Sequence, residues 1–317
     1  MRKGKEIPVY LTAGFLDSGK TQFIKSILTP DGLADGSRTL LFCCEEGEEE
    51  YDAAALLKQN VVLINIENYE DLTTQMLRDY EKKYKPEQVL FEYNGMWSMA
   101  ELDMQILPEN WILYQIVVTV EAPTFQVYAQ NMASLMMEKL RNADMIIFNR
   151  CDDELKEMLR KRNIKMLNRQ AAIYLEFEDG RESEDYDSGV PPFDMSGEVL
   201  ELSDEDYGVW YTDVQEHPDR YEGKKVRYRG MVAKSAKFPE GSFVAGRFAM
   251  VCCADDTTFL GMICFGPDHE KVKTKDWVWV TAEVRTEYVK LYHGDGPVLH
   301  TIKVEPAEKP EEELIYF

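Results

Sequence analysis

A loop of eight residues near the start of the chain has the composition of a phosphate-binding site. Residues 14–21 read Gly-Phe-Leu-Asp-Ser-Gly-Lys-Thr and fit the pattern G-x-x-x-x-G-K-[ST]. In such a loop the backbone N–H groups converge on phosphate oxygens, and the N-terminus of the next helix adds a positive dipole. The residues that we expect to contact a nucleotide are Gly14, Asp17, Ser18, Gly19, Lys20, Thr21 and Gln22.

Two side chains of this loop carry the expected chemistry. The Lys20 amine would reach the β- and γ-phosphates, and the Thr21 hydroxyl would hold Mg²⁺. Both would stabilise the charge that develops when water attacks the γ-phosphate. Asp17 is a carboxylate inside an anion-binding loop, so we expect it to point away from the phosphates or to face the metal.

A second element, residues 88–95, reads Gln-Val-Leu-Phe-Glu-Tyr-Asn-Gly. A strand that ends here would bring a carboxylate and then a glycine to the γ-phosphate. We expect Glu92 to act on Mg²⁺ or its water shell and the Gly95 N–H to contact the γ-phosphate. The simpler alternative is a strand that ends in an ordinary turn.

A third element concerns the base of the nucleotide. Residues 143–152 form an apolar run that ends in Asn-Arg-Cys-Asp. In P-loop GTPases a strand end reading N-K-x-D recognises guanine, because the Asp carboxylate accepts from two N–H groups that adenine lacks. Asn149 and Asp152 occupy these places, and Arg150 replaces the lysine while keeping its charge and its long stem. We therefore predict guanine rather than adenine, the alternative being an Asn/Asp turn cap.

Alternating apolar runs and helical patterns must position these residues. They predict an α/β P-loop domain over 1–178, with a mostly parallel sheet and helices on both faces. The pattern then changes, and about five strands in about 90 residues predict a small all-β, OB-like antiparallel barrel over 207–317. The expected strands are Ile7–Thr12, Thr39–Cys43, Val61–Asn65, Gln88–Glu92, Ile112–Val120, Ala143–Asn149, Lys225–Val232, Phe243–Cys253, Thr258–Phe265, Trp277–Glu283 and Val298–Val304.

Between the two expected domains the chain is strongly acidic. Residues 176–206 hold 13 carboxylates and one arginine, and the whole chain of 317 residues has a net charge of −22. Such a segment buries too little apolar surface to offset its ordering entropy, so we expect residues 179–206 to be a linker. The acidic charge and the lack of a basic stripe argue against a nucleic-acid partner.

The composition also indicates where the protein works. No apolar run approaches the roughly 18 residues that a membrane helix needs, so we expect no membrane span. The charged start leads into a glycine loop rather than a cleavage site, which predicts no signal peptide. We therefore expect a cytoplasmic protein whose six cysteines are reduced.

Taken in order, four segments resemble the CobW-like P-loop GTPases over about residues 5–178. They are the loop at 14–21, the Cys-Glu-Glu-Gly-Glu-Glu-Glu-Tyr-Asp run at 44–52, the Glu-Tyr-Asn-Gly turn at 92–95 and the strand end at 149–152. These GTPases belong with those that insert nickel into urease and hydrogenase. The resemblance implies slow GTP hydrolysis coupled to metal delivery or metal homeostasis. It also places Glu45, Gly47, Glu48 and Asp52 in a switch region, with Glu45 and Glu48 as candidates for activating water.

One departure from that family bears on metal. CobW-like members usually carry a C-x-C-C motif just after the third strand, whereas residues 63–72 of this chain contain no cysteine. Thiolate loading of the first domain with metal therefore cannot be transferred from the family. Cys43, Cys44 and Cys151 are as consistent with small core residues as with ligands.

Residues 207–317 resemble the soluble C-terminal domain of the YcgQ-like permease-subunit family. The resemblance rests on the runs 217–232, 246–255 and 276–281 and implies no defined chemistry. Cys252, Cys253 and Cys264 lie in this region with all four histidines, and sulfur and imidazole ligands favour Zn²⁺. The cysteines are either a zinc or redox site or buried core thiols.

These observations favour a GTP-binding protein with weak, Mg²⁺-dependent GTPase activity. We expect it to be a metallochaperone or metal-homeostasis factor for zinc or a similar ion, with a metal-receiving protein as partner. One alternative is a non-enzymatic, nucleotide-dependent adaptor that docks on a membrane permease. Another is an ATP-using kinase-like enzyme, against which Asn149 and Asp152 argue.

Overall fold

The computed structural model describes residues 5–47, 49–161, 164–166, 168–181, 183–186, 191, 193–250 and 257–316. The chain divides into two compact units. Unit 1 contains the residues up to 156 together with 168–188, and unit 2 contains 157–167 together with the residues from 189 onward. We describe each unit by itself.

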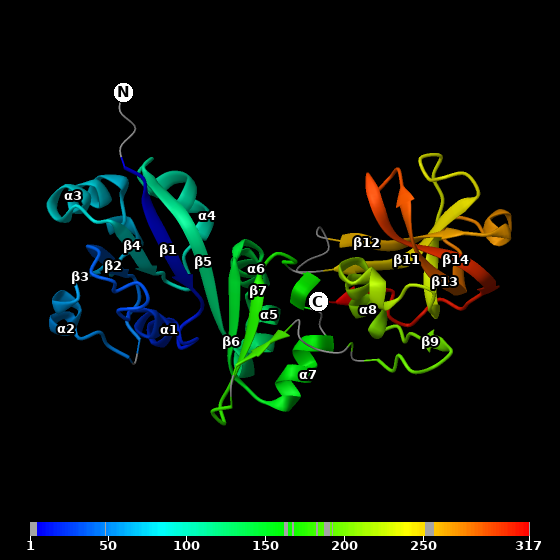
Figure 1. The fold of residues 1–317 in the computed structure, drawn as a ribbon, viewed down its shortest axis with the longest axis horizontal. Helices are drawn as coiled ribbons and strands as arrows, with labels where there is room; N and C mark the ends of the chain where they lie inside the picture. The colour runs from blue at the N-terminus through cyan, green and yellow to red at the C-terminus, as the bar shows by residue number, and fades with distance from the viewer. Residues whose placement is uncertain are drawn as a thin grey trace. The chain divides into compact units, whose positions relative to one another are not determined.

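Unit 1 is built on a sheet of eight strands in the order β3-β2-β4-β1-β5-β6-β7-β8 (Figure 1). The first seven strands along the chain pair in parallel, and only β8 is antiparallel to its neighbour. The strands are β1 (Ile7–Ala13), β2 (Thr39–Cys43), β3 (Val61–Asn65), β4 (Gln88–Glu92), β5 (Trp111–Glu121), β6 (Met145–Cys151), β7 (Ala172–Phe177) and β8 (Glu184–Asp185).

Among the described residues, no helix is both long enough and apolar enough to cross a membrane.

Helical segments connect the strands of unit 1, as parallel pairing requires. These connecting segments are α1 (Lys20–Ile27), α2 (Ala53–Lys58), a 3₁₀ turn (Tyr69–Asp71), α3 (Thr74–Tyr84), α4 (Met99–Glu101) with a π-helical continuation (Leu102–Ile106), a 3₁₀ turn (Ala122–Thr124), α5 (Phe125–Asn131), α6 (Ala133–Asn142), α7 (Asp153–Lys161) and a 3₁₀ turn (Ile164–Met166).

The central strands are buried on both faces, which is why they read as nearly continuous apolar runs in the sequence. Every residue of β4 is buried, and Val9 and Leu11 of β1 lie fully inside. On one side of the sheet, Ile24 of α1 packs with Leu41 and Leu90 in a single apolar cluster. The prediction of an α/β P-loop fold is therefore confirmed.

Two predicted helices are shorter or divided in the structure. The pattern over Asn68–Tyr84 predicts one helix, but α3 begins only at Thr74 because the Thr73 side chain accepts a hydrogen bond from the Met76 N–H and caps the helix there. The pattern over Thr124–Leu140 is divided into α5 and α6. At the end of α5 the Asn131 side chain donates to the Val127 carbonyl, one turn back in the helix.

Unit 2 is rich in β-structure and also contains helix α8 (Asp206–Glu216). Strands β10, β11, β12, β14 and β13 pair in that order, and β13 also pairs with β10, so the five strands form a closed cycle. Of these pairings only β12–β14 is parallel. The strands are β10 (Lys225–Ala233), β11 (Ser242–Met250), β12 (Thr257–Phe265), β13 (Trp277–Val289) and β14 (Gly294–Pro306), with β9 (Val199–Glu201) and β15 (Leu314–Tyr316) added at the sides.

Two features of unit 2 differ from expectation. The sequence Gly-Asp-Gly-Pro at 294–297 is typical of a turn, but these residues belong to β14, and the reversal lies at 290–293, where His293 adopts a positive φ of 56°. The acidic segment, expected to be a linker, contains strand β9, which pairs in parallel with β10. Its carboxylates meet cations of β10, because Glu198 contacts Lys225 and Glu201 contacts Arg227.

Candidate functional site

The loop at 14–21 connects β1 to α1 and requires glycine at two positions. Gly14 has a φ of 149°, and a Cβ there would lie 2.3 Å from the carbonyl oxygen of Thr119. Gly19 has a φ of 97°, and a Cβ there would lie 2.5 Å from Nδ2 of Asn149. Both positions lie in the φ range that favours glycine, and neither has space for a side chain. The loop is therefore pressed against the ends of β5 and β6.

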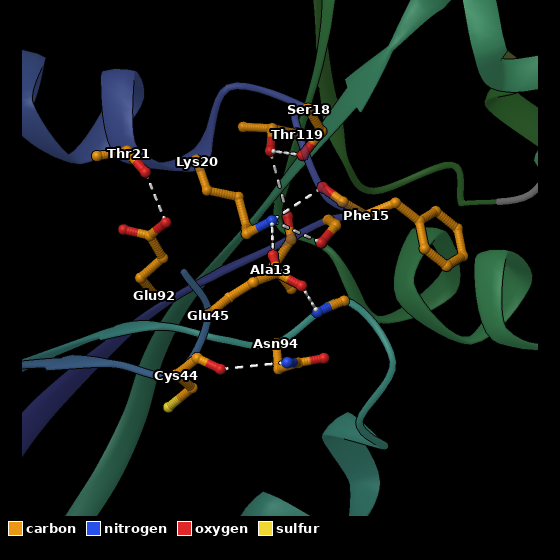
Figure 2. A network of polar contacts seen from close by, with 12 residues as sticks. Ala13, Phe15, Ser18, Lys20, Thr21, Cys44, Glu45, Glu92, Asn94 and Thr119 are labelled. Atoms are coloured by element: carbon orange, nitrogen blue, oxygen red, sulfur yellow. Dashed lines mark hydrogen bonds and ion pairs between the residues drawn. The ribbon is translucent and has the colours of Figure 1, made fainter. Parts of the chain in front are cut away.

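Lys20 is the buried cation of this loop. Its side chain is only 3% exposed, and Nζ donates hydrogen bonds to the carbonyl oxygens of Gly14, at 3.0 Å, and Phe15, at 2.8 Å (Figure 2). Nζ also lies 2.5 Å from Oε2 of Glu45. An ammonium has three donors. Two hold the loop in shape, and the charge of the ammonium is paired with the Glu45 carboxylate.

A pair of hydroxyl groups fastens the loop to the neighbouring strand. The Oγ of Ser18 lies 2.7 Å from Oγ1 of Thr119, and both side chains are buried (Figure 2). Thr119 belongs to β5, which lies directly beside β1 in the sheet. This contact fixes the middle of the loop, so that the backbone amides are held in place before a ligand arrives.

Glu92, at the end of β4, connects the helix after the loop to the segment after β2. One carboxylate oxygen, Oε1, accepts from the Thr21 hydroxyl at 2.7 Å (Figure 2). The other oxygen accepts from the Tyr51 hydroxyl. Burial, together with the nearby Glu92 carboxylate, raises the pKa of Tyr51 well above its usual range, so its proton stays on the phenol and is donated. A hydroxyl and a carboxylate side by side form the oxygen donor set that Mg²⁺ prefers.

Glu45, which follows β2 in the chain, bridges two of the predicted site residues. Besides its contact with Lys20, its Oε1 accepts from the backbone N–H of Gly95 at 3.3 Å. Gly95 packs so closely on the loop that a Cβ there would lie 2.6 Å from the carbonyl oxygen of Gly14. Lys20, Glu45 and Gly95, predicted from three separate motifs, therefore meet at one point.

The space above the loop is a pocket of about 310 Å³. It contains eight of the predicted site residues, and the remaining four that line it are Leu16, Gly47, Glu49 and Glu121. The predicted residues in the pocket are Asp17, Gly19, Lys20, Thr21, Gln22, Glu45, Glu92 and Arg150. Asp17 and Gln22 are exposed.

The strand end at 149–152 approaches the same pocket from β6. The Asn149 amide lies against Gly19, and Arg150 donates to the Asp17 carbonyl at 3.2 Å and pairs with Glu121. Asp152 is exposed, and its Oδ1 accepts from the Leu155 N–H at 2.7 Å, which caps helix α7. The structure thus brings Asn149 and Arg150 to the loop and gives Asp152 a capping contact.

Three contact residues were missed from the sequence. Tyr51 belongs to the acidic run at 44–52, but the sequence predicted no role for its hydroxyl, which donates to Glu92. Thr119 and Glu121 lie at the end of an apolar strand, and nothing in their spacing distinguishes them from other strand-end residues. Thr119 and Glu121 could have been identified only from the expectation that the end of their strand lies beside the glycine loop. Glu48, a candidate from the resemblance, lies outside the described residues.

The described cysteines are free thiols, and all of them except the half-buried Cys43 are buried. Burial raises the pKa of Cys43 to about 11 and that of Cys264 to about 12, so both remain protonated thiols near neutral pH. The Cys264 sulfur lies 3.8 Å from the Tyr228 hydroxyl inside unit 2. Cys252 and Cys253 fall outside the described residues. Within the part of the chain that is described, no group of three or more His, Cys, Asp or Glu side chains is placed to hold a metal ion.

Two family models match this chain. The nucleotide-binding domain of CobW/HypB/UreG matches residues 8–174, and the DUF1980 C-terminal domain matches residues 179–317. The UPF0703 protein YcgQ of Bacillus subtilis (strain 168) is 20% identical over 121 residues, which are 38% of this chain and 42% of that protein. The chain thus spans about two fifths of the length of this curated relative.

Solved structures of low identity resemble the chain as well. A Zn(II)-bound triple mutant of the YjiA GTPase is 15% identical, with a TM-score of 0.43, over 82% of this chain and 88% of that chain. The hydrogenase maturation factor HypB from Archaeoglobus fulgidus is 14% identical, with a TM-score of 0.36, over 56% of this chain and 84% of that chain. HypB from Helicobacter pylori, in complex with nickel, is 15% identical, with a TM-score of 0.33, over 55% and 80%.

Proposed function

This chain belongs to the CobW/HypB/UreG nucleotide-binding family, and we propose that it is a GTP-binding protein that hydrolyses GTP slowly and acts in metal handling. The observation that carries the proposal is the position of Lys20. A buried ammonium with two donors fixed on the Gly14 and Phe15 carbonyls, and with its charge paired with the Glu45 carboxylate, is arranged to bind a phosphate chain.

The residues around Thr21 fit Mg²⁺. Its hydroxyl lies 2.7 Å from the Glu92 carboxylate, and both are oxygen donors at the edge of the pocket. Thr21 and Glu92 would hold the ion, directly or through water. When bound, Mg²⁺ would neutralise part of the charge on the phosphate oxygens.

For hydrolysis, the chain supplies mainly positioning and charge. Lys20 would stabilise negative charge on the phosphate oxygens, and the Gly95 N–H would contact the γ-phosphate. The arginine nearest the loop, Arg150, is engaged by the Asp17 carbonyl and by Glu121. With that guanidinium turned to protein partners, we expect slow turnover by the isolated chain.

The preference for guanine rests on Asn149 and Asp152. Asn149 lies against the loop, and Asp152 is exposed at the same strand end. We expect GTP to compete with a bound guanine nucleotide at least 100-fold better than ATP. Asp152→Asn is the informative variant, because Asn can still cap α7 through its oxygen but cannot accept from both guanine N–H groups.

The control for this experiment is Asp153→Asn. Asp153 is the next carboxylate along the chain, and it is exposed and paired with Arg181. The proposal predicts that Asp152→Asn reduces the preference for GTP over ATP at least tenfold, whereas Asp153→Asn leaves it unchanged. Equal selectivity in the two variants would defeat the assignment of Asp152 to the base.

The metal role is tested by titrating metal-free protein with zinc, with and without GTP and Mg²⁺. If the protein couples nucleotide to metal, GTP must change the zinc affinity, and by reciprocity zinc must change the GTP affinity by the same factor. A protein that binds GTP but not zinc would not be a zinc metallochaperone.

A second candidate function is a nucleotide-dependent adaptor. It is favoured by the match of residues 179–317 to a domain family separate from the nucleotide-binding one. In that case GTP binding would be retained while turnover is negligible, and a membrane permease would co-purify with the protein only in one nucleotide state. Measurable GTP turnover without such a partner would favour the first candidate.

A further inference from the structure

The segment after β2, residues 44–52, is attached to the phosphate loop by two side chains from its two ends. We call it the switch segment; Glu48 within it is not among the described residues. At its start, Glu45 contacts Lys20 and the Gly95 N–H. Near its end, Tyr51 donates to Glu92, which also accepts from Thr21. In Figure 2 the Glu92 carboxylate faces Thr21, and Glu45 lies close to Lys20.

The two partners of Glu45 are the groups that a terminal phosphate would need. Under the proposed function, the Lys20 ammonium and the Gly95 N–H both face the γ-phosphate. One carboxylate now contacts both, with Oε2 at 2.5 Å from Nζ and Oε1 at 3.3 Å from the amide nitrogen. Two acceptor oxygens on one planar anion thus reproduce the contacts of two phosphate oxygens.

The contact between Glu45 and Lys20 is an ion pair without a well-aligned hydrogen bond. Although Oε2 lies within ion-pair distance of Nζ, this buried oxygen has no hydrogen-bond partner of adequate geometry. A tetrahedral phosphate, with three terminal oxygens, could align with the same ammonium better than the carboxylate does. The Glu45 contact is therefore suited to being exchanged for a phosphate.

We propose that the Glu45 carboxylate competes with the γ-phosphate of a nucleotide for the Lys20 ammonium and the Gly95 N–H. As long as Glu45 keeps these contacts, the chain binds a nucleoside diphosphate in preference to a triphosphate. The inference rests on the proposed function, because it assumes that the loop binds a nucleotide. A diphosphate ends before the point where Glu45 meets Gly95, so it leaves the contact intact. A triphosphate places a second anion there, and like charges at that distance repel strongly in a buried site.

The contacts of Tyr51 extend this competition to the metal side. The Thr21 hydroxyl now donates to Glu92, and Tyr51 donates to the other oxygen of the same carboxylate. A bound triphosphate with its metal would engage both the Glu92 carboxylate and the Thr21 hydroxyl, directly or through water. Displacement of Glu45 and loss of the Tyr51 contact would then release the switch segment from both ends, so that this segment reports which nucleotide is bound.

The experiment measures the affinities of the full-length protein for GDP and for a non-hydrolysable GTP analogue, with Mg²⁺ present. The variant Glu45→Gln removes the competing charge and is expected to raise the ratio of triphosphate to diphosphate affinity at least tenfold. The matched control is Glu46→Gln, an exposed carboxylate one residue further along, which removes the same charge outside the site. The ratio in this control should stay within twofold of the wild type.

A ratio in Glu45→Gln that stays within twofold of the wild type would overturn the inference while leaving nucleotide binding, and hence the proposed function, intact. Failure of the wild-type protein to bind either nucleotide would instead reject the proposed function and this inference with it. A second measurement needs no variant: amide hydrogen exchange across residues 44–52 should be faster with the triphosphate analogue than with GDP. Equal exchange in the two complexes would also overturn the inference.

Discussion

The side-chain amide of Asn149 lies against Gly19, so that a Cβ on the glycine would come within 2.5 Å of Nδ2. This contact joins the phosphate loop to the strand end that is expected to recognise the base. A substitution of either residue should therefore affect the binding of both the phosphates and the base of a nucleotide.

Gly19→Ala is expected to reduce nucleotide affinity at least 100-fold. The new methyl group would collide with Asn149, and the φ of 97° would strain any side chain. The matched control is Gly36→Ala, because Gly36 has nearly the same φ of 96° but no atom within 4 Å of the new Cβ. Backbone strain alone costs roughly 1–2 kcal/mol of stability and is present in both variants. Nucleotide titration that finds equal affinity in the two variants would contradict the importance of the Asn149 contact.

Thr21→Val is expected to remove the Mg²⁺ dependence of GTP binding. Valine has nearly the same shape as threonine but lacks the hydroxyl that lies 2.7 Å from Glu92. We expect at least a tenfold loss of GTP affinity in Mg²⁺ and little change in a chelator, whereas Thr21→Ser, which keeps the hydroxyl, should behave like the wild type. The measurement is the GTP affinity with Mg²⁺ and with chelator, and a Val variant that still responds to Mg²⁺ would argue against a metal contact at this hydroxyl.

Several strands of unit 1 could be predicted from the sequence. Strands β2, β3 and β4 have the bounds expected from their apolar runs. For β2 and β4 the reason is burial, because strands buried on both faces need apolar residues throughout. The three-residue strands β9 and β15 were not predicted. Val199–Glu201 lies in the acidic segment, and what makes it a strand is its pairing with β10, a contact that local composition does not contain.

In the site, too, the local motifs could be predicted from the sequence, whereas the contacts between distant residues could not. The loop, Glu92, Gly95 and Asn149 were predicted because each belongs to a short motif whose spacing is local. The contacts between them were not, since Ser18 and Thr119 are 101 residues apart and Tyr51 and Glu92 are 41 apart. Such pairs depend on which strands become neighbours, and the order of strands in a sheet follows from packing of the whole unit.

Asp204→Asn is expected to destabilise unit 2 by about 3–5 kcal/mol. Asp204 accepts from the Arg247 guanidinium at 2.7 Å and also pairs with Arg229. The Arg247 side chain is only 1% exposed, so removing its counter-charge leaves a buried cation uncompensated. Urea unfolding can be followed by tryptophan fluorescence, because three of the five tryptophans (210, 277 and 279) belong to unit 2.

The control for this prediction is Glu201→Gln. Glu201 pairs with Arg227 at 3.0 Å, but its side chain is 62% exposed, and such surface pairs contribute about 1 kcal/mol or less. If Asp204→Asn shifted the unfolding transition no more than Glu201→Gln, the arginine would have found another partner or water, and the buried-charge explanation would be wrong.

Lys139 gives the protein a pH dependence that can be tested. This lysine of α6 is fully buried, donates to the Trp97 carbonyl at 3.2 Å, and lies over the Phe15 ring. Burial, aided by repulsion from Lys20 and opposed by Glu138, lowers the pKa of Lys139 to about 8. Between that pH and the usual lysine value of about 10.4, the unfolded chain holds a proton that the folded chain has lost. The free energy of unfolding should therefore receive a contribution from Lys139 that rises with pH across this window.

Lys139→Met should remove this contribution. Below pH 8 the wild type carries a buried charge that the variant lacks, so the variant should be more stable at pH 7, by roughly 3 kcal/mol at most, since one pKa unit corresponds to about 1.4 kcal/mol. The difference between the two proteins should shrink as the pH approaches 10. Urea unfolding at pH 7, 8, 9 and 10 measures it, with Lys82→Met, which alters an exposed lysine, as the control. A difference that stays constant with pH would mean that Lys139 does not lose its proton in this window.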